Sequence, residues 1–450
     1  MLIPFTLSSL IAPALVLAAL EVDIEDPESI RAAARLVAAD LMSFYEGELP
    51  GRVPGILPGP PPDGDYYWWQ GGALWGTMLD YWHWTEDDTY NDVVYRALLH
   101  QAADTRDFMH PNWTASLGND DQSFWALSSM IAAETGFQDP PEDEPQWLAL
   151  TQAVWNEQAS DDRRDDTCGG GLRWQIYQKR GYEYKNTISN GCFFNIGARL
   201  ARYTGNATYA RWSEETWDWL MGVGFIDDEW NVYDGGHVPQ NCTDTNLQMY
   251  SYNAGILLLG AAYMYNYTGD QVWRERIDPF LDQTLNRFFP DGIAYEPICE
   301  EKRCTFDAVT FKGYIHRWLA SAAQVAPFMR ERVMRVLKTS AQAAANQCVG
   351  GDNGRMCGFR WRSGEFDNFV AAANQMNVLA ALSSVLAFDA PIPLTNSTGG
   401  TSRGNPSAGH ETAPIIEWPT ITTGDRVGAG MLTAAVILGG LGTMGWMGWD

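Results

Sequence analysis

The segment Thr204-Gly205-Asn206-Ala207-Thr208-Tyr209 joins two stretches with helical periodicity, near residues 187–203 and 207–222. A glycine just after a helix favours a left-handed C-cap, and the asparagine that follows can cap the next helix. Similar Thr-Gly turns begin at Thr135 and Thr268. A turn that recurs in this way indicates an internal repeat of helical hairpins.

Twelve stretches of the chain show helical periodicity, and no run of alternating β-branched residues is long enough to build a sheet. In the first stretch, Pro27 follows Asp26 as a potential N-cap, and apolar side chains then recur on one face. We expect helices near residues 27–46, 69–84, 90–109, 120–135, 144–159, 187–203, 207–222, 246–267, 270–288, 307–325, 326–347 and 366–388.

The connections between these helices alternate in length, with short turns after the even-numbered helices and long loops before them. Six hairpins of this kind fit a closed, all-α (α/α)6 barrel, in which every long loop falls on one rim. The even-numbered helices would point their positive N-terminal ends towards that rim, which would be the active-site rim. An open helical solenoid is the structural alternative. The long loops are residues 47–68, 110–119, 160–186, 223–245, 289–306 and 348–365.

Asp120 and Asp121 stand where a long loop enters the fourth helix. Two carboxyls in one cleft are the minimum for breaking a glycosidic bond, because one attacks or activates water and the other protonates the leaving oxygen. Position separates this pair from the four other Asp-Asp pairs of the chain. The structural alternative is that Asp120 caps the helix and Asp121 compensates the helix dipole.

The composition excludes some partners. Fifty-six acidic and thirty basic side chains give a formal charge of −26, which repels nucleic acid and anionic lipid. Twenty Trp, nineteen Tyr and eighteen Phe exceed the needs of a core of this size. Some of these rings are therefore available to bind the apolar faces of sugars.

Seven cysteines indicate an oxidising compartment. Cys299 with Cys304, and Cys348 with Cys357, are close enough in sequence to pair locally. Two of the remaining three could form a third disulfide, which would leave one free thiol; these are Cys168, Cys192 and Cys242. No Cys or His spacing suggests a metal site, so no metal or cofactor is expected.

Both ends of the chain indicate export. Residues 1–19 read as a signal peptide, with a buried N-terminal helix as the alternative. Residues 391–426 read as a Ser/Thr/Gly/Pro-rich linker with a GPI-attachment region, and residues 427–450 as the hydrophobic tail of a GPI signal. A true single membrane span is the alternative for that tail. Five sequons predict N-glycosylation at Asn112, Asn206, Asn241, Asn266 and Asn396.

Several blocks occur in a specific order along residues 20–390. They begin with Tyr66-Tyr-Trp-Trp-Gln-Gly-Gly, Asn119-Asp-Asp-Gln-Ser-Phe-Trp, Cys168-Gly-Gly-Gly-Leu-Arg-Trp-Gln and Lys185-Asn-Thr-Ile-Ser-Asn-Gly. Val232-Tyr-Asp-Gly, Tyr250-Ser-Tyr-Asn-Ala-Gly and Phe311-Lys-Gly-Tyr-Ile-His-Arg-Trp-Leu follow. In this set the chain resembles glycoside hydrolase family 76, the endo-1,6-α-mannosidases, and most closely its fungal GPI-anchored branch implicated in cell-wall biogenesis.

The resemblance implies an (α/α)6 barrel and a retaining double displacement. Asp120 would be the nucleophile and Asp121 the acid/base. A helix N-terminus favours the ionised nucleophile, while the neighbouring anion raises the pKa of its partner and keeps that partner protonated. The two titrations would be coupled.

Further residues of these blocks are candidates for sugar binding. Asp234 matches a family aspartate of the sugar-binding cleft, although it could also be a turn residue. Lys312 is expected on a solvated helix face, with binding of an acidic or phosphorylated group as the alternative. Trp68 and Trp69 could stack on a sugar or belong to the core. Five polar residues could either donate hydrogen bonds to mannose hydroxyls or have a structural role in capping and loop closure. They are Gln70, Lys185, Asn186, Asn190 and Asn253.

The resemblance also implies partners. The donor would be a GPI glycan or α-1,6-mannan, and the acceptor of the glycosyl group would be water or cell-wall glucan. Transfer to glucan would cross-link GPI-anchored proteins to the wall, and the chain itself would reach the outer face of the plasma membrane and the cell wall through the secretory pathway. A non-catalytic mannan-binding wall lectin on the same fold is the alternative, although a lectin has no need of two adjacent carboxyls.

Overall fold

The computed structural model describes residues 19–113, 117–409 and 422–447, so that nearly all of the expected signal peptide lies outside the described residues. Twelve α-helices build the larger of two compact units. They are α1 (Pro27–Met42), α2 (Trp68–Thr85), α3 (Asn91–Ala102), α4 (Asn119–Thr135), α5 (Trp147–Ala159), α6 (Thr187–Thr204), α7 (Ala207–Gly222), α8 (Ser251–Thr268), α9 (Gln271–Phe288), α10 (Phe311–Val325), α11 (Arg330–Ala345) and α12 (Ala372–Ser384).

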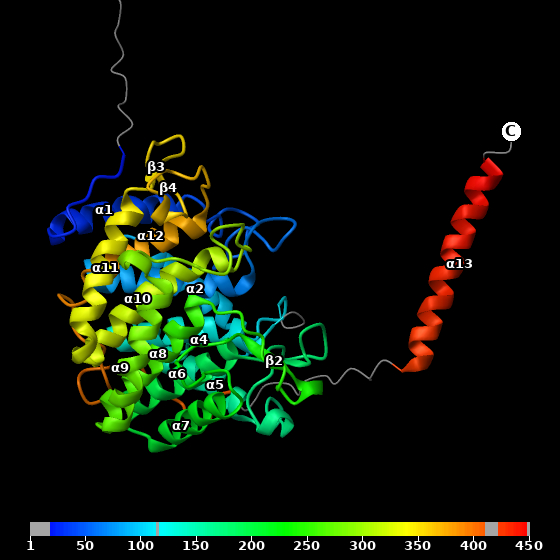
Figure 1. Ribbon diagram of the computed structural model, residues 1–450, viewed down its shortest axis with the longest axis horizontal. Helices are drawn as coiled ribbons and strands as arrows, with labels where there is room; N and C mark the ends of the chain where they lie inside the picture. Colours follow the sequence, from blue (N-terminus) through cyan, green and yellow to red (C-terminus); the bar gives the residue numbers. More distant parts are fainter. Residues whose placement is uncertain (1–18, 114–116, 410–421, 448–450) are drawn as a thin grey trace, which may run out of the picture. The chain divides into compact units, whose positions relative to one another are not determined.

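The even-numbered helices form a closed inner ring. In Figure 1, α7, α9 and α11 lie outside α4, α6 and α8. Each inner helix packs against the next, and α12 packs back against α2. These six helices are buried along nearly their whole length, whereas odd-numbered helices such as α7 and α11 bury one face and expose the other. The contact between α12 and α2 confirms the (α/α)6 barrel and excludes an open solenoid.

The glycine turns close the hairpins as the sequence predicts. Gly136, Gly205 and Gly269 follow α4, α6 and α8 with φ of 66°, 74° and 68°. In each case the glycine N–H donates to a carbonyl of the last helical turn. At the end of α2, Glu86 adopts the same left-handed conformation, with φ of 63°.

Several helices are shorter than their periodicity predicts. The third ends at Ala102 because Ala103 has φ of 59°, which is not helical. The eighth begins at Ser251, since Asn246 is held in an extended pairing with Gly235. The twelfth begins at Ala372, after the extended Ala371. The apolar spacing of a helix continues into these loops, but the backbone there is not helical.

Two small antiparallel sheets lie within the long loops. One pairs β1 (Tyr184–Asn186) with β2 (Gly235–His237), and Lys185 stands opposite Gly236. The other pairs β3 (Cys348–Gly350) with β4 (Met356–Cys357). Strands of two or three residues are too short to show the alternating pattern of a β-strand in the sequence.

Three disulfides link residues of the loops. The predicted pairs Cys299–Cys304 and Cys348–Cys357 are confirmed. The third disulfide is Cys168–Cys242, which joins two long loops, and Cys192 is the buried free thiol.

The folded domain extends past residue 390, the limit that composition predicted. Leu394 donates its backbone N–H to the Glu134 carbonyl at 2.7 Å, and Asn396 donates to the Tyr203 carbonyl at 2.9 Å. Further along, Asn156 donates through Nδ2 to the Ala408 carbonyl at 2.8 Å. Polar, Pro-rich composition therefore did not prevent residues 391–409 from docking on the barrel.

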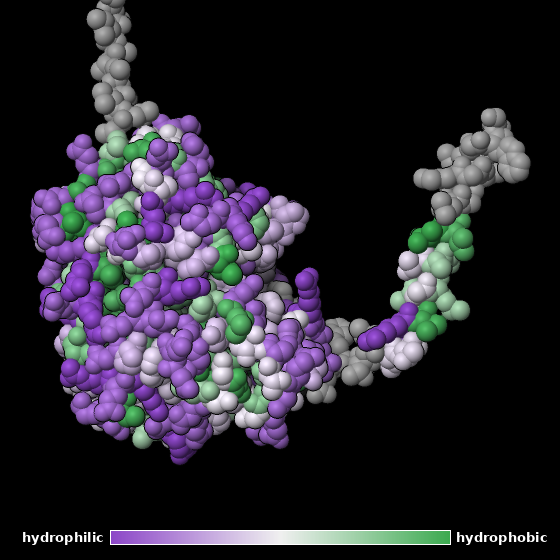
Figure 2. Space-filling view, in the orientation of Figure 1, coloured by the Kyte–Doolittle hydropathy of each residue, from purple (hydrophilic) through white to green (hydrophobic). Residues whose placement is uncertain are grey.

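A separate helix, α13 (Thr423–Met447), belongs to the second compact unit. Within residues 19–113, 117–409 and 422–447, no helix has both the length and the apolar character needed to cross a membrane. The visible face of the barrel domain is dominated by hydrophilic residues, in agreement with the large negative charge (Figure 2).

Candidate active site

A cavity of about 210 Å³ opens at the N-terminal ends of the inner helices. Five of the six inner helices, or the residues just before them, contribute to its wall. The long-loop rim is therefore where side chains from distant parts of the chain meet. The lining residues are Trp69, Asp120, Asp121, Phe124, Trp174, Tyr184, Asn186, Asp234, Tyr250, Tyr252, Thr305, Asp307, Ala308 and Phe311.

Asp120 and Asp121 lie in the first turn of α4 and both line this cavity. The Gly118 backbone N–H donates to Asp121 Oδ2 at 2.7 Å, and the Asp121 N–H donates to Asp120 Oδ1 at 3.0 Å. Asn186 Nδ2 approaches Asp120 Oδ2 at 3.5 Å. The N-cap of α4 is Gly118 and not Asp120, and Asp121, at the third helical position, reaches back to the Gly118 N–H.

Gly118 shows how close the two carboxyls are. A Cβ at this position would lie 2.3 Å from Asp120 Oδ1 and 3.2 Å from Asp121 Oδ2. These two oxygens therefore lie no more than about 5.5 Å from each other, which is closer than the two carboxyls of inverting glycosidases.

The pair is held in place by the loop that precedes β1. Asn119 donates its backbone N–H to the Trp174 carbonyl and its Nδ2 to the Arg173 carbonyl, both at 2.9 Å. The buried Arg163 donates through Nη1 to Asn119 Oδ1 at 2.8 Å. The backbone N–H and the side-chain amide of Asn119, the residue before the pair, are thus hydrogen-bonded within the protein.

Both carboxyls titrate above their usual range. Burial, and then the charge of Asp121, raise the pKa of Asp120 well above its ordinary value. Burial raises the pKa of Asp121 to about 6; the Gly118 N–H opposes this shift, and the charge of Asp307 adds to it. The two carboxyls therefore titrate as a coupled pair, as expected for neighbouring acids in one cavity.

Asp307 is a third carboxyl of the cavity that sequence reasoning missed. It accepts a hydrogen bond from Trp69 Nε1 at 3.2 Å, and burial raises its pKa. A signal was available, because Asp307 stands at the start of a predicted inner helix on the long-loop rim, as Asp120 does. Trp69, a predicted candidate for sugar binding, also lines the cavity.

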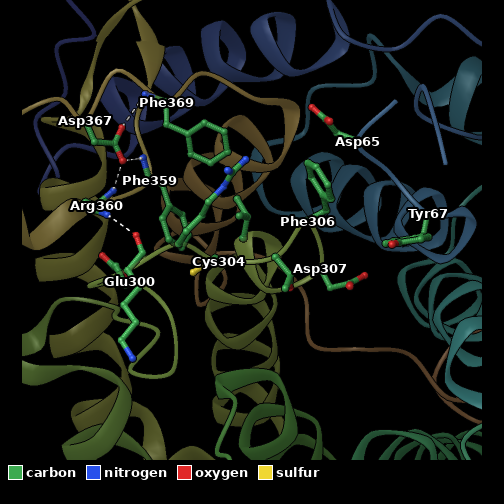
Figure 3. Close-up of a pocket in the computed structure, with 14 residues that line it drawn as sticks. Asp65, Tyr67, Glu300, Cys304, Phe306, Asp307, Phe359, Arg360, Asp367 and Phe369 are labelled. Carbon is green, nitrogen blue, oxygen red and sulfur yellow. Dashed lines mark hydrogen bonds between the residues drawn. The ribbon is translucent and has the colours of Figure 1, made fainter. Parts of the chain in front are cut away.

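A larger cavity of about 900 Å³ adjoins the first and shares Thr305 and Asp307 with it (Figure 3). Three of its aromatic side chains, Tyr67, Phe306 and Phe369, are exposed. We call this space the outer cavity. Its walls come from the loops that carry the disulfides Cys299–Cys304 and Cys348–Cys357.

Asp234 also lines the cavity of about 210 Å³, as the resemblance implies; we call this space the catalytic cavity because it holds the candidate catalytic pair. Tyr184 donates its hydroxyl to Asp234 Oδ2 at 2.7 Å, and Asn246 Nδ2 donates to the same oxygen at 3.2 Å. Burial raises the pKa of Asp234, and its hydrogen-bonding neighbours oppose that shift. Asp234 is thus held by neighbouring side chains at the wall of the cavity.

The aromatic wall of the cavity is formed by side chains that belong to the family-like sequence blocks but were not predicted as sugar ligands. Tyr252 and Phe311 stack in parallel with ring centroids 3.9 Å apart. Trp174 is 36 % exposed, so part of its ring is available for contact. Flat, partly exposed rings beside carboxyls are typical of sugar-binding sites.

Four predicted sugar ligands have structural roles. Trp68 is buried and donates through Nε1 to Gln101 Oε1 at 2.8 Å. Gln70 is buried and bridges the Tyr67 N–H and the Phe306 carbonyl. Asn190 is buried and holds both the N–H and the carbonyl of Leu172. Their polar atoms are already used inside the protein.

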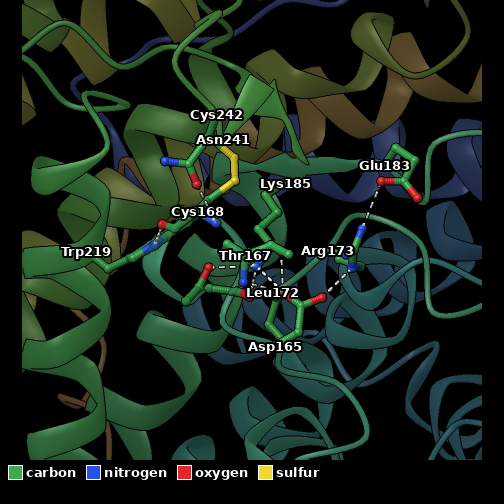
Figure 4. A network of polar contacts seen from close by, with 12 residues as sticks. Asp165, Thr167, Cys168, Leu172, Arg173, Glu183, Lys185, Trp219, Asn241 and Cys242 are labelled. Carbon is green, nitrogen blue, oxygen red and sulfur yellow. Dashed lines mark hydrogen bonds and ion pairs between the residues drawn. A yellow bond between two sulfur atoms is a disulfide. The ribbon is translucent and has the colours of Figure 1, made fainter. Parts of the chain in front are cut away.

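Lys185 is the fourth of these residues (Figure 4). Its side chain is fully buried, and Nζ donates to Asp165 Oδ1 and to the carbonyls of Thr167 and Gly170, each at 2.8 Å, and to the Gly171 carbonyl at 3.1 Å. Loop closure therefore accounts for Lys185. Lys312 is likewise buried, paired with Glu300, and does not lie on a solvated helix face.

The other two amides differ. Asn186 lines the cavity and caps α6, since its Oδ1 accepts from the Ser189 N–H at 3.3 Å. Asn253 is buried in the first turn of α8 and helps to lower the pKa of Asp234, although its amide makes no hydrogen bond of ordinary geometry. Asn253 therefore has hydrogen-bonding capacity beside the cavity.

All five sequon asparagines are exposed, at Asn112, Asn206, Asn241, Asn266 and Asn396. Asn266 differs from the others because its Nδ2 donates to the Val325 carbonyl at 2.8 Å, a bond that a glycan would replace. Among the described residues, no group of three His, Cys, Asp or Glu side chains could hold a metal ion.

Comparison with known proteins agrees with this geometry. The sequence profile of Glycosyl hydrolase family 76 matches residues 29–397. Mannan endo-1,6-alpha-mannosidase DCW1 of Saccharomyces cerevisiae is 44% identical over 424 residues, which cover 93% of each chain. Mannan endo-1,6-alpha-mannosidase DFG5 of the same yeast is 40% identical, covering 95% of this chain and 94% of that protein.

Solved structures share the fold. Dfg5 from Chaetomium thermophilum, in complex with glucosamine, is 54% identical with a TM-score of 0.85, covering 87% of this chain and 98% of that chain. The GH76A alpha-1,6-mannanase of Salegentibacter sp. HEL1_6 is 16% identical with a TM-score of 0.63, covering 79% and 98%, and supports the fold alone. The chain therefore belongs to glycosyl hydrolase family 76 and is a glycoside hydrolase.

Proposed function

We propose that this protein is a retaining α-mannoside glycosidase and transglycosidase of the endo-1,6-α-mannosidase type. The observation that carries the proposal is the placement of Asp120 and Asp121 in one cavity, with oxygens within about 5.5 Å of each other. The names of the yeast relatives support the α-1,6-linked mannose donor.

In the proposed reaction, Asp120 attacks the anomeric carbon and Asp121 protonates the departing glycosidic oxygen. Asp121 then deprotonates the acceptor hydroxyl, which displaces Asp120 from the anomeric carbon. The first step requires Asp120 to be ionised and Asp121 to be protonated. Positive charge that develops at the anomeric carbon favours the ionised Asp120, as do the N-terminus of α4 and the Asn186 amide.

The acceptor decides the product. Water gives hydrolysis, whereas a sugar hydroxyl gives transfer. The outer cavity supports transfer, because it shares Thr305 and Asp307 with the catalytic cavity and presents exposed aromatic rings to a second saccharide (Figure 3). We propose that the donor is a GPI glycan or α-1,6-mannan and that the acceptor is cell-wall glucan, which would cross-link GPI-anchored proteins to the wall.

The proposed location is the outer face of the plasma membrane and the cell wall. A signal peptide at residues 1–19, the attachment region within residues 391–426 and the tail at residues 427–450 support GPI anchoring. Three disulfides support an oxidising compartment. Cell-surface labelling with and without phospholipase treatment tests the anchor.

Azide rescue tests the two catalytic roles. With a dinitrophenyl glycoside of α-1,6-mannobiose, the first step needs no acid, so Asp121→Ala should accumulate the glycosyl-enzyme. Azide should then release the α-configured glycosyl azide. Asp120→Ala, given the α-glycosyl fluoride and azide, should release the β-configured product.

The opposite pairing of variant and anomer would reverse the assignment. If neither variant yields a glycosyl azide and both keep wild-type turnover, the proposal fails. Mass spectrometry with a short β-1,3-glucan as acceptor separates the products, because a mannosylated glucan shows transfer and free sugar alone shows hydrolysis. Asp228→Ala, which removes an exposed acid elsewhere, is the control variant.

A further inference from the structure

A third cavity, of about 310 Å³, lies on the other side of the loop that precedes β1. It shares no lining residue with the catalytic cavity or the outer cavity. We call it the peripheral cavity. It is lined by Ala159, Asp161, Arg164, Asp165, Asp166, Gly169, Gly170, Gly171, Trp212, Glu215, Thr216 and Trp219.

One wall of the peripheral cavity is a run of three glycines, Gly169, Gly170 and Gly171, that the protein holds in place. Lys185 Nζ donates to the carbonyls of Gly170 and Gly171 from the buried side. Trp219 Nε1 donates to the Cys168 carbonyl at 3.0 Å, and Cys168 is tied to Cys242 by a disulfide. The cavity is therefore preorganised and does not depend on a mobile loop.

The glycines also keep this wall open. Gly169, Gly170 and Gly171 all have positive φ, from 72° to 121°, so other residues are strained there. A Cβ on Gly169 would meet nothing within 4 Å, and one on Gly170 would meet only the Trp219 ring, at 3.8 Å. The space above these two residues is thus unfilled, with an indole at its side.

The side chains around this space combine aromatic faces with hydrogen-bonding groups. Trp212 and Trp219 are both partly exposed. The carboxylates of Asp161 and Asp166 are exposed and make no ion pair or hydrogen bond with any described residue. Arg164 lies against the Trp212 ring, with its guanidinium carbon 5.1 Å from the centroid, and its Nη2 has no hydrogen-bond partner.

This chemistry selects among ligand classes. An anion is disfavoured because four acidic side chains line the cavity against one arginine. A metal ion is disfavoured because the Asp165 carboxylate is already engaged by Lys185 and Arg173, and no metal-binding cluster exists among the described residues. A neutral sugar suits the site, because its C–H face packs on an indole and its hydroxyls donate to carboxylates.

We infer that the peripheral cavity is a second carbohydrate-binding site, which takes hexose units of a neutral polysaccharide chain at a distance from the catalytic pair. The chain bound there is either an α-linked mannan or a β-linked glucan, because both are neutral and present hexose hydroxyls and C–H faces. The site would hold the enzyme on a polymer, and it does not depend on the catalytic roles proposed above.

The test uses the full chain carrying Asp120→Asn, so that the probes are not consumed. Isothermal titration with α-1,6-mannotetraose and, separately, with a β-1,3-glucan tetrasaccharide counts the sites. We expect at least one probe to bind outside the catalytic cavity, and Asp161→Ala/Asp166→Ala to abolish that binding or weaken it about tenfold. Trp212→Ala should have the same effect. The probe that loses binding identifies the polymer.

Asp228→Ala/Glu229→Ala removes two exposed acids from a different loop and should leave both titrations unchanged. In the active enzyme, the Asp161/Asp166 variant should hydrolyse a soluble dinitrophenyl α-1,6-mannobioside as the wild type does. The inference is overturned if neither probe's titration changes in the Asp161/Asp166 and Trp212 variants. That result would leave the proposed catalytic function untouched, since turnover of the soluble donor is measured separately.

Discussion

Gly118 offers the most direct test of the geometry at the catalytic pair. Its backbone, with φ of −91° and ψ of 163°, is open to any residue, so Gly118→Ala adds a methyl group without backbone strain. That methyl would lie 2.3 Å from Asp120 Oδ1 and 3.0 Å from the Trp174 carbonyl oxygen. Ordinary carbon–oxygen contacts are about 3.3–3.6 Å, so the Asp120 carboxylate must move by roughly 1 Å.

A displacement of about 1 Å in a reacting group can cost about 100-fold in rate. We therefore expect kcat of Gly118→Ala to fall about 100-fold, which corresponds to about 2.7 kcal/mol of activation free energy. KM should change little, because Asp234 and the aromatic wall stay in place. Overpacking should lower the free energy of unfolding by about 1–3 kcal/mol.

The assay is steady-state hydrolysis of a dinitrophenyl α-1,6-mannobioside, with urea denaturation measured on the same samples. Gly222→Ala is the matched control, because a Cβ at the end of α7 would meet nothing within 4 Å. It should keep wild-type kcat. If Gly118→Ala also keeps wild-type kcat while remaining folded, the carboxylate is not where catalysis needs it, and the argument from Gly118 is refuted.

Three further predictions concern buried charges. Asp307→Asn should shift the alkaline limb of the pH–rate profile to lower pH, because the Asp307 charge raises the pKa of Asp121; a shift to higher pH would contradict this. Lys185→Met should lower the free energy of unfolding in urea by about 1–3 kcal/mol, since it leaves the carbonyls of Thr167, Gly170 and Gly171 without their donor, and a change in KM alone would instead favour a sugar ligand. Burial raises the pKa of Glu296 to about 8, so the stability this group contributes is complete below its unfolded value and is lost as pH rises through about 8. Glu296→Gln should therefore lose less stability than the wild type between pH 5 and pH 9 in thermal denaturation, and an equal loss would refute the assignment.

Part of the active site was accessible from the sequence because its signals are local. Asp120 and Asp121 are neighbours at a helix start, and that position could be inferred from helical periodicity and loop length. Asp307 satisfied the same criterion and could have been found by it. Tyr184 could not, because its role depends on Asp234, fifty residues away in the chain, which reaches it through the pairing of β1 with β2.

The predicted hydrogen-bonding residues show where sequence reasoning ends. Asn186 and Asn190 lie one turn apart, yet Asn186 faces the cavity and Asn190 is used up by the Leu172 backbone. Lys185 looks like a binding residue in the sequence but is surrounded by four acceptors in the fold. The amino-acid type determines which hydrogen bonds a side chain can make. Whether those bonds are already made within the protein depends on its surroundings in the fold.

The sequence by itself determined the hairpins, their glycine turns, the two local disulfides and the position of the aspartate pair, because each is set by residues close together in the chain. The tertiary structure decided that α12 meets α2, that Cys168 pairs with Cys242, and that five inner helices bring their ends to one cavity. Closure of the ring depends on packing between residues about three hundred positions apart. The periodicity of one helix shows which face is buried but does not specify the helix that packs against that face.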